Sequence, residues 1–184
     1  SRGGNGIAGM GWSLSGLSSI HRCPQTVAQD SQNSVVAYSM DDRLCLDGRR
    51  LMLVSGRGYG AEGAIYRTEI DDFAKVTQLG GSIAAGSTAH FKVEHKSGQV
   101  DWYGFAPGAG EVVGRHTPAG APGPLSWARV RQEDRHGNFV LYRYKTYDTP
   151  AEKFGEYVID RVEYTGHGST AGDRRIEFGY QDRA

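Results

Sequence analysis

The serine-containing segment at residues 12–16 and the glycine-rich segment at residues 56–60 are the first places where enzyme chemistry could lie. A hydrolase serine sits in a Gly-x-Ser-x-Gly turn between a strand and a helix. The order Trp-Ser-Leu-Ser-Gly at 12–16 misplaces the glycine and has no helix-forming sequence after it. The order Gly-Arg-Gly-Tyr-Gly at 56–60 lacks the Lys-Ser/Thr of a phosphate-binding loop. We therefore interpret both segments as turns or loops, with Trp12 as a buried anchor.

Metal-binding side chains are present, but they are not spaced as ligands. The histidines are His21, His90, His95, His116, His136 and His167. None of them stands in an H-x-H or H-x-x-x-H pattern. The paired acids Asp41-Asp42 and Asp71-Asp72 lack the alternating aspartates of an EF-hand calcium loop. We predict no metal and no cofactor, and we interpret these acids as solvated turn carboxylates.

Basic and aromatic side chains alternate late in the chain, as they do in proteins that grip single-stranded nucleic acid. These residues are Arg129, Arg131, Arg143, Lys145, Tyr142, Tyr144 and Tyr147. Acidic residues lie close to them in sequence, and over the whole chain 21 acidic residues balance 21 lysines and arginines. A neutral chain exerts no long-range attraction on nucleic acid. We therefore predict no nucleic-acid partner and expect cross-strand charge pairs instead.

The two cysteines, Cys23 and Cys45, are too far apart for a CxxC redox or zinc motif. In an oxidising compartment they could form one disulfide. It would close a loop of about twenty residues and stabilise the fold by ~3 kcal/mol, because it constrains the unfolded chain. In the alternative they remain two buried thiols that pack as small apolar groups.

Tight turns between apolar runs recur along the chain and predict β-hairpins. Asp-Gly is a strong hairpin signal, because both residues tolerate positive φ. The predicted turns and the runs that they join are Asp47-Gly48 between 43–46 and 49–54, Ser97-Gly98 between 91–94 and 100–103, Gly137-Asn138 between 127–131 and 139–144, and the loop 166–172 between 157–164 and 175–180.

The fold class follows from these hairpins and from the absence of helical periodicity. No window of a dozen residues keeps an i, i+3, i+4, i+7 apolar face free of glycine or proline. Residues 158–164 alternate instead, with Val158, Val162 and Tyr164 on one face and Ile159 on the other. We predict an all-β protein with little or no helix, in which antiparallel hairpins form a twisted sheet or open sandwich.

The domain organisation turns on one stretch rich in proline and glycine, residues 107–124. It separates an N-terminal hairpin region at 1–106 from a second hairpin region at 125–184, and we interpret it as a loop or linker. We expect the parts to form one continuous structural unit. No apolar run approaches the ~20 residues of a membrane-spanning helix. The chain begins without an initiator methionine or a signal peptide, so we expect a piece of a longer protein.

Five motifs occur in a distinctive order between residues 4 and 99. They are GNGIAGMGWSLSGLSSI at 4–20, HRCP at 21–24, DRLCLDGRRL at 42–51, YRTEID at 66–71 and KSGQ at 96–99. Together they resemble the N-terminal region of the Salmonella virulence plasmid B and toxin-complex B family, within the wider Rhs/YD-repeat proteins. The resemblance runs to about Tyr103. It continues more weakly from Asp134 to Tyr144, in the manner of a YD repeat ending a hairpin, and it is broken at 107–124.

This resemblance implies a strand-built segment of a large hollow β-shell that encloses or delivers a C-terminal toxin domain. It implies a bacterial protein, secreted or at the cell surface. Its partners would be the remaining shell segments of the same polypeptide, the enclosed toxin domain and other toxin-complex subunits. The family's ADP-ribosyltransferase domain and self-cleaving aspartate site lie elsewhere, so the resemblance places no active site here. We expect a non-catalytic structural segment and not an enzyme.

The alternative function is a surface adhesin-like β-domain that binds a glycan or a partner protein. Exposed tryptophan and tyrosine rings often form binding platforms. The candidates for such a platform are Tyr59, Trp102, Tyr103 and Trp127. This hypothesis requires those rings to be exposed, whereas the shell hypothesis lets them brace neighbouring strands.

The cysteine alternatives make a direct prediction. If Cys23 and Cys45 are joined, no thiol of the untreated protein reacts with a labelling reagent. Reduction then raises the intact mass by the mass of two hydrogen atoms. Two reactive thiols in the untreated, unfolded protein would exclude the disulfide.

Overall fold

The computed structural model describes residues 14–70, 73–84, 86, 88–108, 112–147 and 156–180, and within them the regular structure is almost entirely β. The prediction of an all-β fold with little helix is confirmed. The elements are β1 (Ser19–Cys23), α1 (Val27–Asp30), β2 (Arg43–Leu46), β3 (Arg49–Ser55), β4 (Ile65–Thr68), β5 (Lys75–Leu79), β6 (His90–Glu94), β7 (Val100–Tyr103), β8 (Phe105–Ala106), β9 (Val112–Val113), β10 (Arg115–His116), β11 (Ser126–Glu133), β12 (Asn138–Tyr147), β13 (Glu156–His167) and β14 (Arg174–Glu177).

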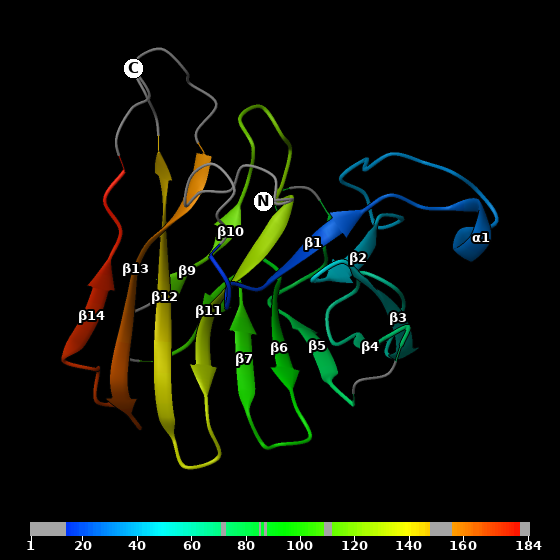
Figure 1. Cartoon of the computed structure of the whole chain (residues 1–184). Helices are drawn as coiled ribbons and strands as arrows, with labels where there is room; N and C mark the ends of the chain where they lie inside the picture. Colours follow the sequence, from blue (N-terminus) through cyan, green and yellow to red (C-terminus); the bar gives the residue numbers. More distant parts are fainter. Residues whose placement is uncertain are drawn as a thin grey trace, which may run out of the picture.

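The main sheet closes on itself into a barrel. Antiparallel pairs run in chain order from β1 to β7, and β7 then pairs with β11. β1 also pairs with β11, where Ile20 lies opposite Trp127, so the ring of β1–β7 and β11 has no open edge (Figure 1). Our sequence analysis expected a twisted sheet or open sandwich. Closure brings together strands that are about a hundred residues apart, and no local pattern encodes such a pairing.

Three strands extend the sheet beyond the ring. β12, β13 and β14 follow one another from the C-terminal half of β11, and we call them the wing (Figure 1). β9 and β10 come from the segment rich in proline and glycine, and β8 directly precedes it. β9 pairs with β8, and β10 pairs with the first half of β11. The regions on either side of that segment therefore share one sheet, through the pairing of β7 with β11.

The barrel interior is filled by side chains that alternate along the strands. In β6, for example, Phe91 and Val93 are buried and their neighbours are partly exposed. The interior cluster is Ile20, Leu44, Leu46, Leu51, Ala64, Tyr66, Ala74, Val76, Ile83, Ala89, Phe91, Val93, Tyr103 and Trp127. Trp127 is fully buried, and its indole nitrogen donates to the Ala89 carbonyl at 2.7 Å. A Cβ at Gly104, where φ is +80°, would lie 2.5 Å from the Trp127 ring, so only glycine fits there.

A second, smaller cluster joins the wing to the barrel. Ala106, Val130, Phe139 and Leu141 are buried together, with Trp102 and Tyr144 packed against them. The wing departs from the simple alternation predicted for residues 158–164, because Val158 and Ile159 are both buried. The pairing of β12 with β13 shifts register between Arg143 and Tyr144, and this irregularity changes which face the following side chains occupy.

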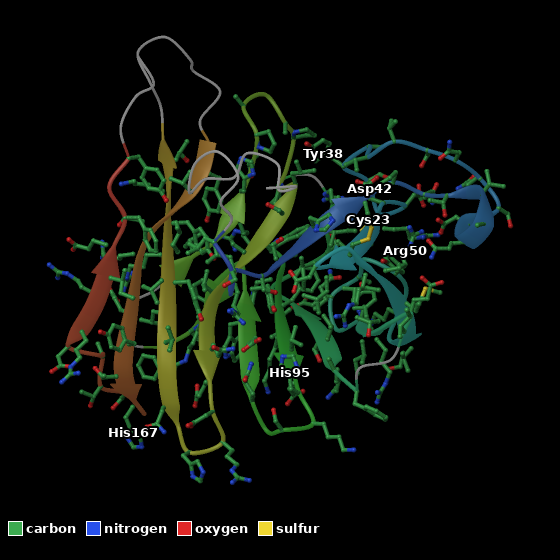
Figure 2. All side chains as sticks on the ribbon, viewed as in Figure 1. Cys23, Tyr38, Asp42, Arg50, His95 and His167 are labelled. Carbon is green, nitrogen blue, oxygen red and sulfur yellow. A yellow bond between two sulfur atoms is a disulfide. The ribbon has the colours of Figure 1, made fainter. Side chains whose placement is uncertain are left out.

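One end of the barrel is closed around a buried ion pair. The Arg22 guanidinium donates to Asp42 at 2.8 Å, and both side chains are almost fully buried, at 0% and 3% exposed. The same guanidinium donates to the carbonyl oxygens of Ser39, Ile83 and Pro124. Figure 2 shows Asp42 beside Tyr38 near this end. Our interpretation of Asp42 as a solvated turn carboxylate is therefore wrong, because the ring surrounds it with β1 and the loops that cross this end.

We predict that Asp42→Ala destabilises the protein by about 3–5 kcal/mol, because it leaves the Arg22 charge buried and unpaired. Urea unfolding followed by tryptophan fluorescence measures this loss. The matched control is Glu177→Ala on β14, whose partner Arg175 is 2.7 Å away but whose ion pair is 62–65% exposed. That change should stay within ~0.5 kcal/mol. Equal losses in the two variants would contradict a special role for the buried pair.

Candidate functional site

A polar cavity of about 320 Å³ lies at the end of the barrel away from Arg22. It is formed where β1, β3 and β7 begin and where β2, β4 and β6 end, which is one edge of an antiparallel ring. Its lining residues are Gly16, Leu17, Ser18, Leu46, Asp47, Arg49, Thr68, His95, Gln99, Asp101, Tyr103 and Arg129. Figure 2 shows His95 well below Asp42 and Tyr38, in keeping with this separation of the two ends.

Asp101 is the buried acid of this cavity. Alternation in β7 turns Asp101 and Tyr103 to the barrel interior. One carboxylate oxygen lies 3.2 Å from His95 Nε2 and 3.4 Å from Arg129 Nη1, and the other accepts from Gln99 at 3.0 Å. Burial alone would raise the pKa of Asp101. The hydrogen bond from His95 and the charge of Arg129 outweigh burial and hold that pKa below its ordinary value.

The Asp47-Gly48 turn supplies a second acid at the rim. Both residues have positive φ, 48° and 80°, and they join β2 to β3. The Asp47 carboxylate accepts from the Ser18 hydroxyl at 2.7 Å and from the Ser19 amide at 2.9 Å. The Tyr103 hydroxyl lies 2.8 Å from Ser18 Oγ and acts as its donor, because the Ser18 proton already goes to Asp47. The turn therefore ties the start of β1 to the barrel.

Arg129 connects the cavity to the wing. Its guanidinium stacks on the Tyr142 ring at 4.7 Å and donates to the Tyr142 hydroxyl and to the Gly16 carbonyl. Its Nε is buried, and among the described residues it has no hydrogen-bond partner. Arg129 thus faces Asp101 on one side and an aromatic ring of β12 on the other. The sequence analysis assigned this arginine to charge pairs across strands, and the structure places it in one.

The polar groups of the cavity are engaged with one another. Ser18 is bound by Asp47 and Tyr103, whereas His95 is bound by Asp101, so the described residues do not set a histidine base against this serine. A nucleophile needs such a base within hydrogen-bond reach. Among the described residues, no three histidine, cysteine, aspartate or glutamate side chains gather as a metal site requires. The arrangement suits the neutralisation of buried charge at the barrel end.

Of the four aromatic candidates for a binding platform, two are buried and two are partly exposed. Trp127 and Tyr103 are buried in the barrel core, at 0% and 2% exposed, so neither can present its ring at the surface. Tyr59 is partly buried, and its hydroxyl accepts from the Leu44 amide and donates to the Leu51 carbonyl. Trp102 packs against the second core cluster. The strands use these rings to fill and brace the barrel, and that corrects the expectation of exposure for Tyr103 and Trp127.

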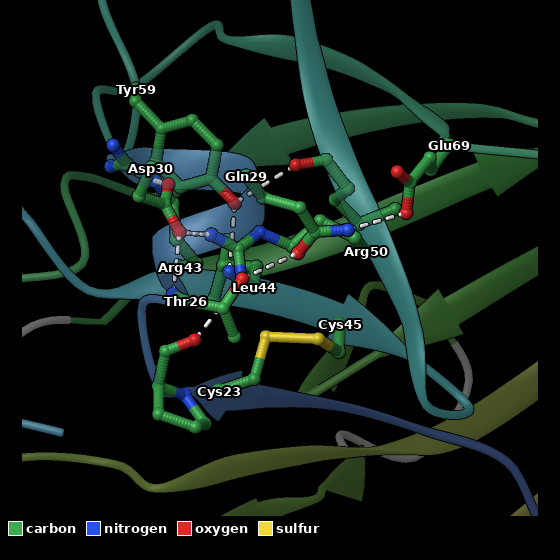
Figure 3. Close-up of a disulfide and its surroundings, with 12 residues drawn as sticks. Cys23, Thr26, Gln29, Asp30, Arg43, Leu44, Cys45, Arg50, Tyr59 and Glu69 are labelled. Carbon is green, nitrogen blue, oxygen red and sulfur yellow. Dashed lines mark hydrogen bonds and ion pairs between the residues drawn. A yellow bond between two sulfur atoms is a disulfide. The ribbon is translucent and has the colours of Figure 1, made fainter. Parts of the chain in front are cut away.

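The remaining predicted residues lie in turns or in a cross-link. Ser97 and Gly98 form the turn between β6 and β7, where Gly98 has φ +85°. Gly137 has φ +82° in the next turn, and Asn138 begins β12 with its amide donating to Asp134. Cys23 and Cys45 form a disulfide (Figure 3). Trp12, Asp71 and Asp72 are outside the described residues.

Our sequence analysis did not identify Asp101, Arg22 or Ser18 as residues of a buried polar network. A usable signal existed for Asp101, because the alternation of Val100-Asp101-Trp102-Tyr103 sets this acid on the same strand face as Tyr103. No comparable signal existed for Arg22. Its partners Ser39 and Asp42 lie in the connection between β1 and β2, whereas Pro124 is 102 positions away and reaches Arg22 only through closure of the ring.

No known protein family matches the chain in a search of family profiles, and no curated protein sequence matches it. Among the described residues, no helix is long and apolar enough to cross a membrane.

Solved structures do share the fold. The N-terminal domain of effector protein SpvB from Salmonella typhimurium strain LT2 superposes with a TM-score of 0.66 at 17% identity, over 92% of this chain and 58% of that one. The Photorhabdus luminescens Tc holotoxin pore gives a TM-score of 0.68 at 16% identity, over 93% of this chain and 8% of that one. The TcdB2-TccC3 structure gives 0.59 at 16% identity, over 84% and 8%.

These likenesses confirm, at the level of the fold, the resemblance to virulence plasmid B and toxin-complex proteins. At 16–17% identity they show the architecture and not the activity. The chain spans 58% of the SpvB domain and 8% of the two toxin-complex chains, so the activities of those proteins do not transfer to it directly.

The Asp101 network makes a prediction about pH. Its carboxyl has a lower pKa in the folded than in the unfolded state, so the unfolded chain takes up the proton first as the pH falls. The stabilisation is therefore complete above the ordinary aspartate pKa of about 4 and is lost as the pH falls below it. Asp101→Asn should cost about 2 kcal/mol at pH 7 and should weaken the dependence of unfolding free energy on pH between about 5 and 3.

The control for this prediction is Glu62→Gln, which changes an exposed carboxylate. It should leave the acid limb of the stability curve as in the wild type. If the unfolding free energies of wild type and Asp101→Asn fall in parallel at acid pH, the network does not hold Asp101 ionised.

Proposed function

We propose that this chain is a non-catalytic structural segment of an exported, toxin-complex-like β-shell that encloses or delivers a toxin domain. The observation that carries the proposal is the shared fold. The same barrel and wing architecture recurs in the SpvB N-terminal domain and as a small part of much longer toxin-complex chains. A fold that recurs as a fraction of a much longer chain suits a structural element, whose task is to join further parts of that chain.

The wing supports this proposal, because it offers a surface on which more sheet can build. Among the described residues β14 is the last strand of the sheet, with no strand on its outer side. Ile176 of β14 lies in register with Val162 and Tyr142, and its side chain is 53% exposed. Val162 and Tyr142 are only partly exposed, so the exposed features here are the strand edge and Ile176. An open sheet edge is normally protected in a native protein. We infer that further segments of the same polypeptide cover it.

The other face of the wing favours water or a polar neighbour. Arg143 and Arg161 both donate to Glu163, at 2.9 and 2.7 Å. Lys145 pairs with Asp160 at 3.0 Å. These pairs neutralise one another across neighbouring strands, so this face carries little net charge. The two faces of the wing therefore differ in character, as expected of a wall with an inner and an outer side.

The cavity supports a structural role more than an enzymatic one. Its serine, histidine and acids are bound to one another at the barrel end. We therefore propose that the segment performs no catalysis. The partners that we propose are the rest of the shell, an enclosed toxin domain and other subunits of a toxin complex. A disulfide is typical of proteins that leave the cytosol and supports export. The adhesin alternative loses support with the burial of Tyr103 and Trp127.

Hydrogen exchange tests the proposal. In the polypeptide that the native gene encodes, the outer-edge amides of β14 should be protected because another strand pairs with them. In the isolated 184-residue chain they should exchange rapidly. The amides shared by β5 and β6 serve as the control and should be protected in both. Rapid exchange at β14 in both proteins would contradict a continuing wall.

A further inference from the structure

We propose that two copies of this chain associate edge to edge through β14, about a two-fold axis that passes between their Ile176 side chains. The two β14 strands run antiparallel and join the two wings into one continuous sheet. This inference concerns the isolated chain, whereas the proposed shell function concerns a longer polypeptide in which other strands cover the same edge. The two proposals can therefore fail separately.

The backbone of β14 presents alternate peptide groups at its outer edge. In an antiparallel ladder the N–H and the C=O of one residue point to the same side, and this side alternates along the strand. The Phe178 amide donates to the Asp160 carbonyl on β13 at 2.9 Å, so the backbone groups of Ile176 also point to β13. Those of Arg175 and Glu177 therefore point outward, where the described residues contain no further strand (Figure 1).

A two-fold axis restricts how this edge pairs with its own copy. Only residues with outward peptide groups exchange hydrogen bonds, so within β14 Arg175 and Glu177 pair either with each other or each with itself. Pairing Arg175 with Arg175, or Glu177 with Glu177, places like charges directly opposite, which destabilises a sheet. The register in which Arg175 faces Glu177 of the second copy places opposite charges there, on both sides of the axis.

This register continues the charge pattern already present in the wing. Glu163 of β13 lies opposite Arg175, and Arg161 lies opposite Glu177. Across the interface the row that begins with Glu163 and Arg175 continues with Glu177 and Arg161 of the second copy, so the sign of the charge alternates throughout. The Arg175 and Glu177 side chains are 65% and 62% exposed, and both are therefore accessible to the second copy.

On the opposite face of the sheet, Ile176 meets Ile176 of the second copy. Ile176 lies in register with Val162 and is 53% exposed. On the axis the two Ile176 residues form a non-hydrogen-bonded pair, a geometry in which the Cα atoms of antiparallel strands lie about 4.5 Å apart. One contact thus covers both the open edge and its exposed apolar side chain.

The association is weak, because the interface is confined to one strand of four residues in each copy. Interfaces well below ~1,000 Å² are typical of transient contacts. We expect a dissociation constant on the order of 10⁻⁴ M. At about 1 μM protein the edge of the isolated chain is then open, and this is the condition for the exchange test of the shell proposal.

Sedimentation equilibrium of the isolated chain, from about 1 μM to about 1 mM, tests the association. The wild-type mass should rise from that of one chain toward that of two. Arg175→Glu alone, or Glu177→Arg alone, places like charges opposite each other and should weaken association about tenfold. An equimolar mixture of these two variants restores opposite charges and should associate as strongly as wild type. Wild type that stays monomeric, or a mixture no stronger than either variant, would overturn the proposal.

Cross-linking tests the register. Ile176→Cys places two thiols directly opposite each other on the axis, within the Cα separation of about 4.4–6.8 Å that a disulfide spans. Mild oxidation should therefore give a covalent dimer on a non-reducing gel. The matched control, Arg174→Cys, lies on the same face of β14 but faces Phe178 of the second copy, so its dimer should form about tenfold more slowly. Equal rates for the two variants would contradict the register.

Discussion

The position of β1 between β2 and β11 depends on one buried side chain, Arg22. Its Nε and both terminal nitrogens donate to oxygens within the barrel end, and its guanidinium also lies over the Tyr38 and Trp127 rings at 5.4 and 5.7 Å. A buried charge is tolerated only while its partners stay in place. The loops that supply those partners must therefore remain folded across the barrel end, and β1 is held in the ring as a result.

Both ends of the barrel accommodate buried charged side chains, but they do so in different ways. At one end Arg22 and Asp42 fill the space so fully that both are buried. At the other end Asp101, Arg129, Ser18 and Asp47 form a network around a cavity. The interior between them is mainly apolar and includes Trp127 and Phe91. The Tyr66 hydroxyl donates to the fully buried Gln78 at 2.8 Å. Buried polar networks at both ends of the barrel determine which strands meet there. They therefore favour the closed ring over an open sheet.

The chemically reactive side chains and the surfaces that are open to further contact lie in different parts of the molecule. The barrel buries its reactive types of side chain in pairs, whereas the wing leaves a strand edge and the exposed Ile176 side chain beyond the ring. The features that reach outward are thus sheet surfaces. Most polar groups that face inward are hydrogen-bonded, although among the described residues the buried Arg129 Nε has no partner. The same fold occurs within the longer toxin-complex chains, where it covers 8% of the chain, and this agrees with the proposed structural role.

The sequence by itself determined the hairpins, the fold class and the likeness to toxin-complex proteins. Asp47-Gly48 and Gly137 act within a few residues of the strands that they join, so their signals are local and readable. Only the tertiary structure decided the closure of β1 on β11, the burial of Trp127 and the meeting of Arg22 with Pro124, 102 positions away. Partners so distant are chosen by register and packing of the whole ring, and no short stretch of sequence contains that information.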